Sequence, residues 1–268
     1  MRISFIVAIA ILVVIGGFFF SHRSQNNETA SGPASAETAA AGRMSGLPSV
    51  DAHTIEAMRA IFPNADPNTG VLTHSIPRYV FGDQAYGERI RRLEPLFLVG
   101  NESAPVLIVK AETDEAAHAE AGALAAIYLT RDSDRLIVSK PAVFFGAGEW
   151  GQAAAAEIID VQGEPAILAR AVGGGMGCFM ESAEIYAFPS QGPRQILERE
   201  FVSLKDEGLY SVGDEVVGAV VRPPSGFDFA LRFTGQFLGD RIDETVLYRM
   251  RGGRLMRVQG ANPLSDGC

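Results

Sequence analysis

Two glycine-rich segments have the residue spacing closest to that of a known chemical site. The first, from Gly146 to Gly151, reads GAGEWG and fits the pattern G-x-G-x-x-G. In dinucleotide-binding folds such glycines let the backbone approach a pyrophosphate at the N-terminus of a helix. Here the next apolar run, residues 166–172, is followed by glycines and not by an acid for the ribose, and hairpin patterns replace a βαβ repeat. We therefore favour a turn that holds Trp150 against a sheet, with nucleotide binding as the alternative.

The second segment, from Gly173 to Gly177, reads GGGMG. Glycine tolerates positive φ angles and lets another backbone or a ligand come close. The segment lacks the Lys-Ser/Thr pair of a phosphate-binding loop, so we interpret it as a structural turn or bulge, with a ligand-facing loop as the alternative. A site would form where the two segments meet, and its predicted ligand-binding residues are Gly148, Glu149, Trp150, Gly174, Gly175 and Glu181.

The rest of the sequence shows no recognisable catalytic or metal-binding pattern. No G-x-S-x-G elbow accompanies the scattered histidines, which are His22, His53, His74 and His118. Asp132 and Asp134 resemble half of a calcium loop, but Arg135 and the lack of further ligands indicate a capped turn. The sequence predicts no cofactor and no metal. A hydrolase remains an alternative only with a triad assembled from distant loops.

Cys178 and Cys268 are the two cysteines of the chain. Two cysteines are too few for a Cys-rich metal site. In an oxidising compartment they would form one disulfide that pins the C-terminus to the second glycine segment. A frayed C-terminus would instead leave Cys268 unpaired.

The charge balance argues against nucleic acid as a partner. The net charge is −9, and the twenty arginines and three lysines are dispersed along the chain. The largest basic groups are residues 89–92 and the four arginines between residues 249 and 257. Binding to nucleic acid needs a concentrated positive face, so we interpret the C-terminal arginines as the solvent-exposed side of a hairpin.

A stretch without charge, from Ile3 to Phe20, determines the predicted location. Its eighteen residues would reach about 27 Å as a helix, close to the roughly 30 Å hydrocarbon core of a bilayer. The stretch is longer than the apolar part of a signal peptide, and three phenylalanines stand where a cleavage site needs small residues. We therefore expect a single-pass anchor in the inner membrane, with the C-terminal domain in the periplasm. A cleaved signal peptide and a soluble periplasmic protein are the alternative.

The N-terminal third of the chain divides by composition. Residues 1–21 form the predicted transmembrane anchor, and residues 22–48, rich in Ser, Ala, Gly, Asn and Thr, form a flexible linker. Residues 49–93 combine a helix at 51–62, capped by its first residue, with an irregular segment rich in proline and glycine.

Residues 94–268 contain the predicted strands of the periplasmic domain. They show a series of short apolar or alternating runs separated by turn residues, and residues 245–258 form the clearest hairpin, with RGGR at its turn. Residues 114–129 have the composition of a helix, but we expect a loop followed by a strand. About ten short strands predict a mainly β domain, an antiparallel sandwich, barrel or propeller-like meander, with one short helix before it.

Three short motifs support a family resemblance over residues 105–260. They are the strand AAIYL at 125–129, the Gly-x-Trp-Gly turn at 148–151, and the glycine-rich loop before an aromatic strand at 173–188. With these motifs the chain resembles a diffuse group of bacterial cell-envelope proteins of unknown function. The glycine-rich segment is also similar to degenerate FG-GAP/VCBS propeller blades, although the Asp-x-Asp-x-Asp-Gly calcium signature is missing. The resemblance implies a β-rich envelope domain and no particular reaction.

We therefore expect a membrane-anchored periplasmic β-domain protein that acts as a binding or interaction module of the cell envelope. Its expected partners are the inner membrane and an envelope protein. The alternatives are an envelope hydrolase, a nucleotide-dependent enzyme that uses the segment from Gly146 to Gly151, and a purely structural part of a larger membrane complex.

The predicted location can be tested with an alkaline-phosphatase fusion to the C-terminus, assayed in intact cells. We expect an active fusion, because the single anchor would place the folded domain outside the cytoplasm. An expressed but inactive fusion would place the domain in the cytoplasm and contradict the prediction.

Overall fold

The computed structural model describes residues 50–73, 76–82, 89–113, 122–133, 135–148, 153–175, 178–206 and 214–265. The predicted anchor and linker lie outside these ranges. Residues 48–268 form one compact unit, which contains every helix and strand named below. No helix in the described ranges is both long and apolar enough to span a membrane.

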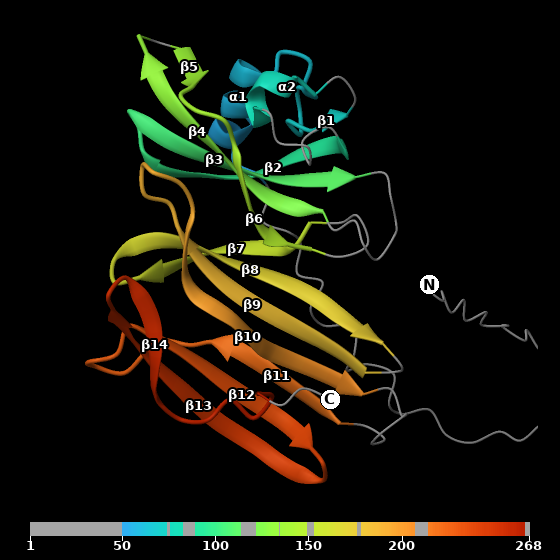
Figure 1. Cartoon of the computed structure of the whole chain (residues 1–268), viewed down its shortest axis with the longest axis vertical. Helices are drawn as coiled ribbons and strands as arrows, with labels where there is room; N and C mark the ends of the chain where they lie inside the picture. Colours follow the sequence, from blue (N-terminus) through green and yellow to red (C-terminus); the bar gives the residue numbers. More distant parts are fainter. Residues whose placement is uncertain are drawn as a thin grey trace, which may run out of the picture. The chain divides into compact units, whose positions relative to one another are not determined.

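The first antiparallel sheet contains six strands of the described chain and runs in the order β1-β2-β3-β4-β5 (Figure 1). β5 and β6 both pair with β4, one with its C-terminal and the other with its N-terminal half. The strands are β1 (Leu72–Thr73), β2 (Ile90–Asn101), β3 (Ala104–Thr113), β4 (Ala123–Asp132), β5 (Arg135–Val138) and β6 (Val143–Ala147).

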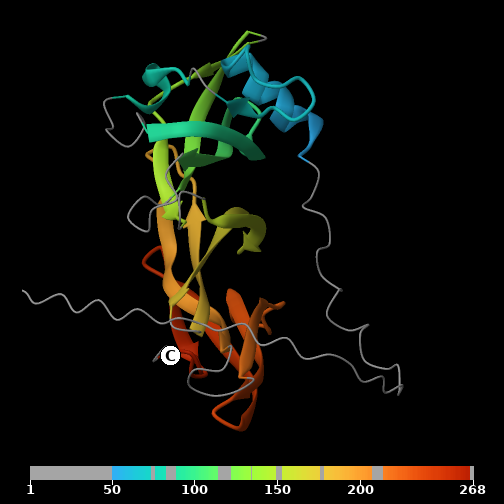
Figure 2. The ribbon, with the colours of Figure 1, turned by 90° about the vertical axis from the view of Figure 1, so that its right-hand side faces the viewer.

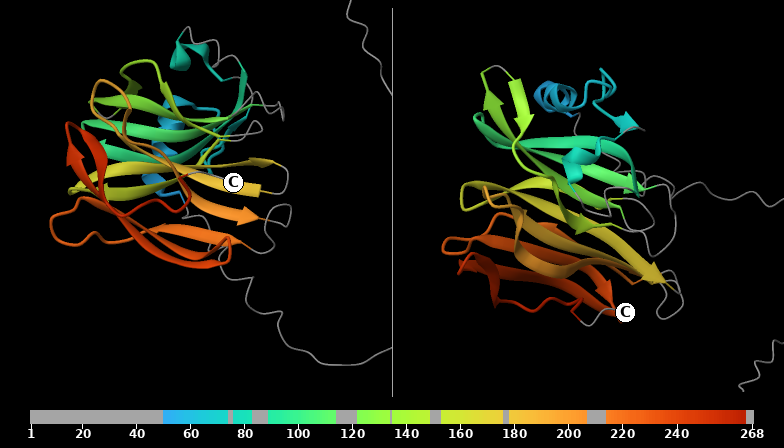
Figure 3. Two further views of the ribbon diagram at one scale, coloured as in Figure 1. Left: turned by 60° about the horizontal axis from the view of Figure 1, so that its bottom comes forward. Right: turned by 45° about the horizontal axis from the view of Figure 1, so that its top comes forward.

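The second sheet is an antiparallel meander in which eight strands of the described chain follow one another in sequence order (Figure 3). They are β7 (Ala155–Val161), β8 (Glu164–Gly175), β9 (Cys178–Ala187), β10 (Arg194–Asp206), β11 (Glu215–Val220), β12 (Phe229–Phe237), β13 (Asp240–Arg251) and β14 (Arg254–Gln259). Several of its hairpins turn through two residues with positive φ, as type I′ turns require. These turns are Gln162-Gly163, Leu238-Gly239 and Gly252-Gly253.

Helix α1 (Ala52–Ile61) packs on the first sheet, where it contacts β2, β3 and β5 (Figure 2). Its cap is Asp51, whose Oδ1 accepts a hydrogen bond of 2.7 Å from the amide of Thr54. Ala57 and Met58 are fully buried on the face toward the sheet. The predicted helix at 51–62 is thus confirmed, and a second helix, α2 (Arg78–Phe81), forms a single turn.

Buried apolar side chains of the described chain gather in three clusters. One lies between α1 and the first sheet, and one lies within the second sheet, where β8 to β10 pack against β11 to β14. The third joins the two sheets, with Leu124 and Ala126 of β4 against Ile167 and Ala169 of β8. This contact fixes which face of β8 is turned toward the first sheet.

The described residues confirm a mainly β protein with two antiparallel sheets and a short helix. One local expectation changes. Residues 173–175 are part of strand β8 and not a turn, because each pairs with a residue of β9. Residues 155–161, which a nucleotide-binding motif would need as a helix, form strand β7.

The cap of α1 gives a test of this part of the fold. We expect Asp51→Ala to lower the free energy of unfolding by about 1 kcal/mol, because the Thr54 amide loses its acceptor. The measurement is urea denaturation of the full chain followed by circular dichroism. Glu56→Ala is the control on the same helix, since its side chain is 81% exposed, and its effect should stay within about 0.5 kcal/mol. Equal losses for the two variants would contradict the capping role.

Candidate functional site

The described part of the first glycine segment, residues 146–148, lies at the end of strand β6 in the first sheet. Gly146 has a φ of +54°, and a Cβ there would lie 3.0 Å from the Cβ of Ala169 and 3.2 Å from Cδ1 of Leu124. The amide of Gly148 donates a hydrogen bond of 2.8 Å to the carbonyl of Gly122, so it is already used within the sheet. Glu149 and Trp150 lie outside the described residues.

Aromatic side chains surround this glycine segment at the contact between the sheets. The ring of Phe145 lies 4.9 Å from that of Tyr186 and 5.1 Å from that of Phe188, measured between centroids. The Tyr186 hydroxyl donates to Glu184 at 2.6 Å, and Glu184 also accepts from Nε of Arg199 at 3.2 Å. Burial, followed by the bond to Glu184, raises the pKa of Tyr186. Gly146 therefore serves close packing between the two sheets.

Of the second glycine segment, residues 173–175 lie in strand β8 of the second sheet. Gly174 pairs with Phe179, and Gly175 pairs with Cys178. Cys178 is 5% exposed and disulfide-bonded. Cys268 lies outside the described residues, so its pairing with Cys178 remains a prediction. Of the predicted ligand-binding residues, the structure brings Gly174 and Glu181 to neighbouring strands of one sheet, whereas Gly148 follows β6 in the other.

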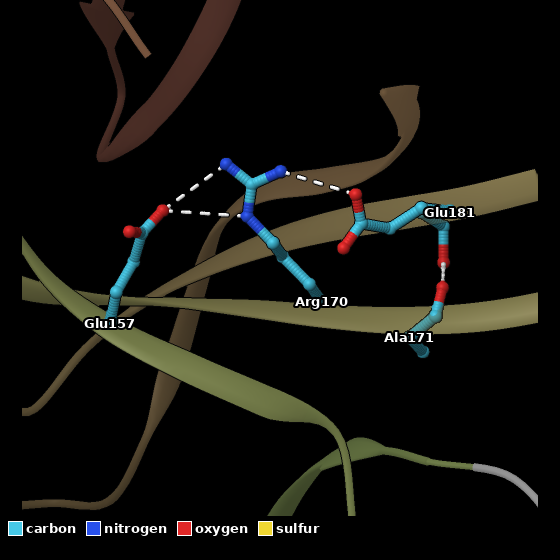
Figure 4. Close-up of polar contacts among 5 residues, drawn as sticks. Glu157, Arg170, Ala171 and Glu181 are labelled. Carbon is cyan, nitrogen blue, oxygen red and sulfur yellow. Dashed lines mark hydrogen bonds and ion pairs between the residues drawn. The ribbon is translucent and has the colours of Figure 1, made fainter. Parts of the chain in front are cut away.

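Glu181 belongs to an ion-pair network that crosses three strands (Figure 4). Arg170 on β8 lies between two carboxylates, with Nη2 at 3.2 Å from Glu157 of β7 and Nη1 at 3.4 Å from Glu181 of β9. The Arg170 side chain is only 20% exposed. Next to this network, the hydroxyl of Ser182 donates to the carbonyl of Ala171 at 3.4 Å. The network borders an exposed region of the sheet.

Beside this network, a row of cross-strand neighbours runs from β8 to β13, and we call it the open strip. Val172 pairs with Glu181, which pairs with Ser203, and the register then continues to Val217, Thr234 and Asp243. Because directly paired residues point to the same side of a sheet, these six side chains share one face. Val172 is 57% exposed and Val217 46%, so the strip presents apolar groups to solvent.

A second row runs alongside the open strip and adds an aromatic ring. Phe179, which is 43% exposed, pairs with Gly174 on one side and with Lys205 on the other. Since glycine has no side chain, Gly174 offers the ring no cross-strand cover. Lys205 pairs in turn with Glu215.

Charges around the open strip are balanced. Arg170 contacts two carboxylates, and Arg232 forms two hydrogen bonds with Asp243, at 3.0 and 3.1 Å. Hydrogen bonding to Arg232 lowers the pKa of Asp243, so this carboxylate stays ionised over the physiological range. The face therefore combines exposed apolar groups with ion pairs of both signs, without a field of one sign.

The described part of the chain offers no catalytic or metal-binding grouping. His53 lies on the exposed side of α1, 4.0 Å from Glu56, and its side chain is 88% exposed. No cluster of three metal-ligating side chains occurs among the described residues. His22, His74, His118 and Asp134 lie outside the described ranges.

Comparison with models of known protein families, with curated proteins and with solved structures finds no match.

The packing role of Gly146 can be separated from its backbone conformation by a matched pair of variants. Gly163 also has positive φ, at +83°, but a Cβ there would meet nothing within 4 Å. We expect Gly163→Ala to lower the free energy of unfolding by about 1 kcal/mol through backbone strain alone. Gly146→Ala should lower it by about 2–3 kcal/mol, because overpacking against Ala169 and Leu124 is added. Equal losses in urea denaturation would show that the sheets do not constrain Gly146.

Proposed function

We propose that this chain is a membrane-anchored periplasmic β-sandwich protein that acts as an interaction module of the cell envelope. In this proposal residues 3–20 anchor the chain in the inner membrane, and the unit formed by residues 48–268 binds another envelope protein through the open strip. The observation that carries the proposal is the exposure of Val172, Phe179 and Val217 on one face of an ordered sheet.

The composition of the open strip favours a protein as the partner. Single exposed apolar residues are ordinary on protein surfaces, but here Val172 and Val217 lie in one cross-strand row, with Glu181 and Ser203 between them, and Phe179 lies in the next row. Ion pairs lie beside these residues. Apolar contacts within a polar surrounding are typical of protein–protein interfaces. A nucleic acid or an anionic lipid surface would need an excess of positive charge, whereas Arg170 and Arg232 are both neutralised by carboxylates.

The enzymatic alternatives gain no support from the geometry. A nucleotide site at Gly146 to Gly151 requires a following helix and free amides, but β7 follows as a strand and the Gly148 amide is engaged. A hydrolase would need a histidine oriented by neighbouring groups, and His53, the one histidine within the described ranges, is exposed to solvent on α1.

Site-specific photo-crosslinking in cells tests this function. A benzophenone amino acid replaces Val217 in the full-length chain, and in a second variant it replaces Met256 on β14, which has a similar exposure of 48% but lies outside the open strip. We expect a crosslink at position 217 to an envelope protein identified by mass spectrometry. Adding Val172→Asp should reduce its yield about tenfold or more, because a charge would be buried at the interface.

The control and the contradicting outcomes are defined by the same experiment. Position 256 should give no crosslink to the same protein. Equal crosslinking at both positions, or a yield that Val172→Asp leaves unchanged, would contradict binding through the open strip. A product with twice the mass of the chain would identify a second copy as the occupant and replace the proposed partner.

A further inference from the structure

A cavity of about 350 Å³ lies at the opposite end of strand β8 from Val172. The ends of four hairpins or connections meet there: β2–β3, β7–β8, β9–β10 and β13–β14. Its volume is at the small end of the range for ligand pockets in proteins, about 300–1,000 Å³. Cavities of this kind, with apolar walls and few polar groups, commonly bind small molecules.

The walls of the cavity are mainly apolar, and its lining includes two side chains of opposite charge. Val99, Pro165, Phe188, Pro189 and Met250 supply the apolar surface. Arg194, the first residue of β10, and Glu164, the first residue of β8, supply the charges. The two are not joined by an ion pair, since they do not approach within 4.0 Å.

The guanidinium of Arg194 lies next to the hairpin between β13 and β14. A Cβ at Gly253 would lie 3.0 Å from Nη1 and 3.3 Å from Cζ of Arg194, so the guanidinium occupies space that a larger residue at 253 would need. Gly253 has a φ of +80° as part of the type I′ turn. The guanidinium thus lies beside this hairpin without an ion pair to a described carboxylate.

Arg194 differs in this respect from four arginines of the second sheet, whereas Arg241, Arg249, Arg251 and Arg257, like Arg194, form no ion pair with a described carboxylate. Arg170, Arg199, Arg232 and Arg254 each form an ion pair with a carboxylate at 2.7–3.4 Å. Among the described residues, no carboxylate pairs with Arg194. A guanidinium beside apolar walls favours a planar, two-oxygen acceptor such as a carboxylate, to which it can donate two parallel hydrogen bonds.

We propose that this cavity binds a small apolar zwitterion, of which an apolar amino acid is the simplest example. The ligand's carboxylate accepts hydrogen bonds from Arg194, its ammonium group pairs with Glu164, and its apolar side chain lies against Phe188 and Met250. A zwitterion matches the lining because the charges of Arg194 and Glu164 are both satisfied and their sum remains zero. The proposal does not depend on the open strip.

Fluorine NMR with three related probes tests this assignment, using the full chain in lipid nanodiscs with empty nanodiscs as the reference. The probes are 4-fluorophenylalanine, its N-acetyl derivative, which keeps only the carboxylate, and its amide, which keeps only the ammonium group. We expect saturable binding of 4-fluorophenylalanine, and at least about tenfold weaker binding of each derivative, because each loses one charge-assisted contact.

Two variants assign the contacts to residues. Arg194→Gln should weaken binding of 4-fluorophenylalanine and of the N-acetyl probe about tenfold but leave the amide unchanged. Glu164→Gln should weaken binding of 4-fluorophenylalanine and of the amide but leave the N-acetyl probe unchanged. Arg222→Gln, at an exposed arginine outside the cavity, is the matched control and should bind all three probes as the unaltered chain does.

Three results would overturn the proposal. They are the absence of saturable binding of 4-fluorophenylalanine, equal affinity for the three probes, and affinities that Arg194→Gln leaves unchanged. Thermal unfolding of each variant confirms that it is folded. If Arg194→Gln does not fold, Met250→Trp serves in its place, because a larger side chain that reduces the cavity should abolish binding of every probe.

Discussion

The close approach of the two sheets is the constraint on which the rest of the described fold depends. Leu124 and Ala126 of β4 meet Ile167 and Ala169 of β8, and Gly146 lies where even a methyl group would press on Ala169. Side chains alternate along a strand, so turning Ala169 toward the first sheet turns Arg170 and Val172 away from it. The ion-pair network and the open strip thus owe their orientation to a contact on the opposite face.

The same contact between the two sheets brings together turns that belong to different sheets. Val99, close to the turn between β2 and β3, lines one cavity with Pro165 and Phe188 of the second sheet. The cavity is thus assembled from turns whose sequences carry no common pattern. Its charged groups, Glu164 and Arg194, each stand at the first residue of a strand, where a side chain can reach beyond the sheet.

Local chemistry made part of the fold predictable from the sequence. Asp51 before an apolar 3–4 repeat predicted α1, and two glycines between alternating runs predicted the hairpin between β13 and β14. Turn residues act within four or five positions, which is why such elements can be predicted without tertiary information. The glycine spacing from 146 to 151 was less informative, because the same letters serve a phosphate only when a helix follows.

The candidate surface was harder to predict because it depends on register. β10 departs from regular pairing with β9 at three places, including the step from Phe201 to Ser203. A shift of one residue moves a side chain to the other face, so the alignment of Glu181, Ser203 and Val217 could not follow from alternation alone. The position of Val172 and Phe179 on this face was also not predicted, because the run of glycines suggested a turn where strand β8 in fact continues. Because the strand continues through the glycines, two of the predicted site residues, Gly174 and Glu181, lie on neighbouring strands of one sheet.

The pairing of neighbours along the chain has a consequence for how the protein acquires its structure. In the second sheet every described strand pairs with the next one in sequence, and in the first sheet β6 alone among the described strands passes over its predecessor to pair with β4. When paired strands are neighbours in sequence, only short loops must be closed to bring them together. The entropic cost of pairing is then low, which favours rapid folding. Each new strand can therefore add to an edge that already exists. A chain that emerges from a ribosome or a translocation pore with its N-terminus first can build both sheets progressively, with β14 completing the second sheet as the last of the described strands.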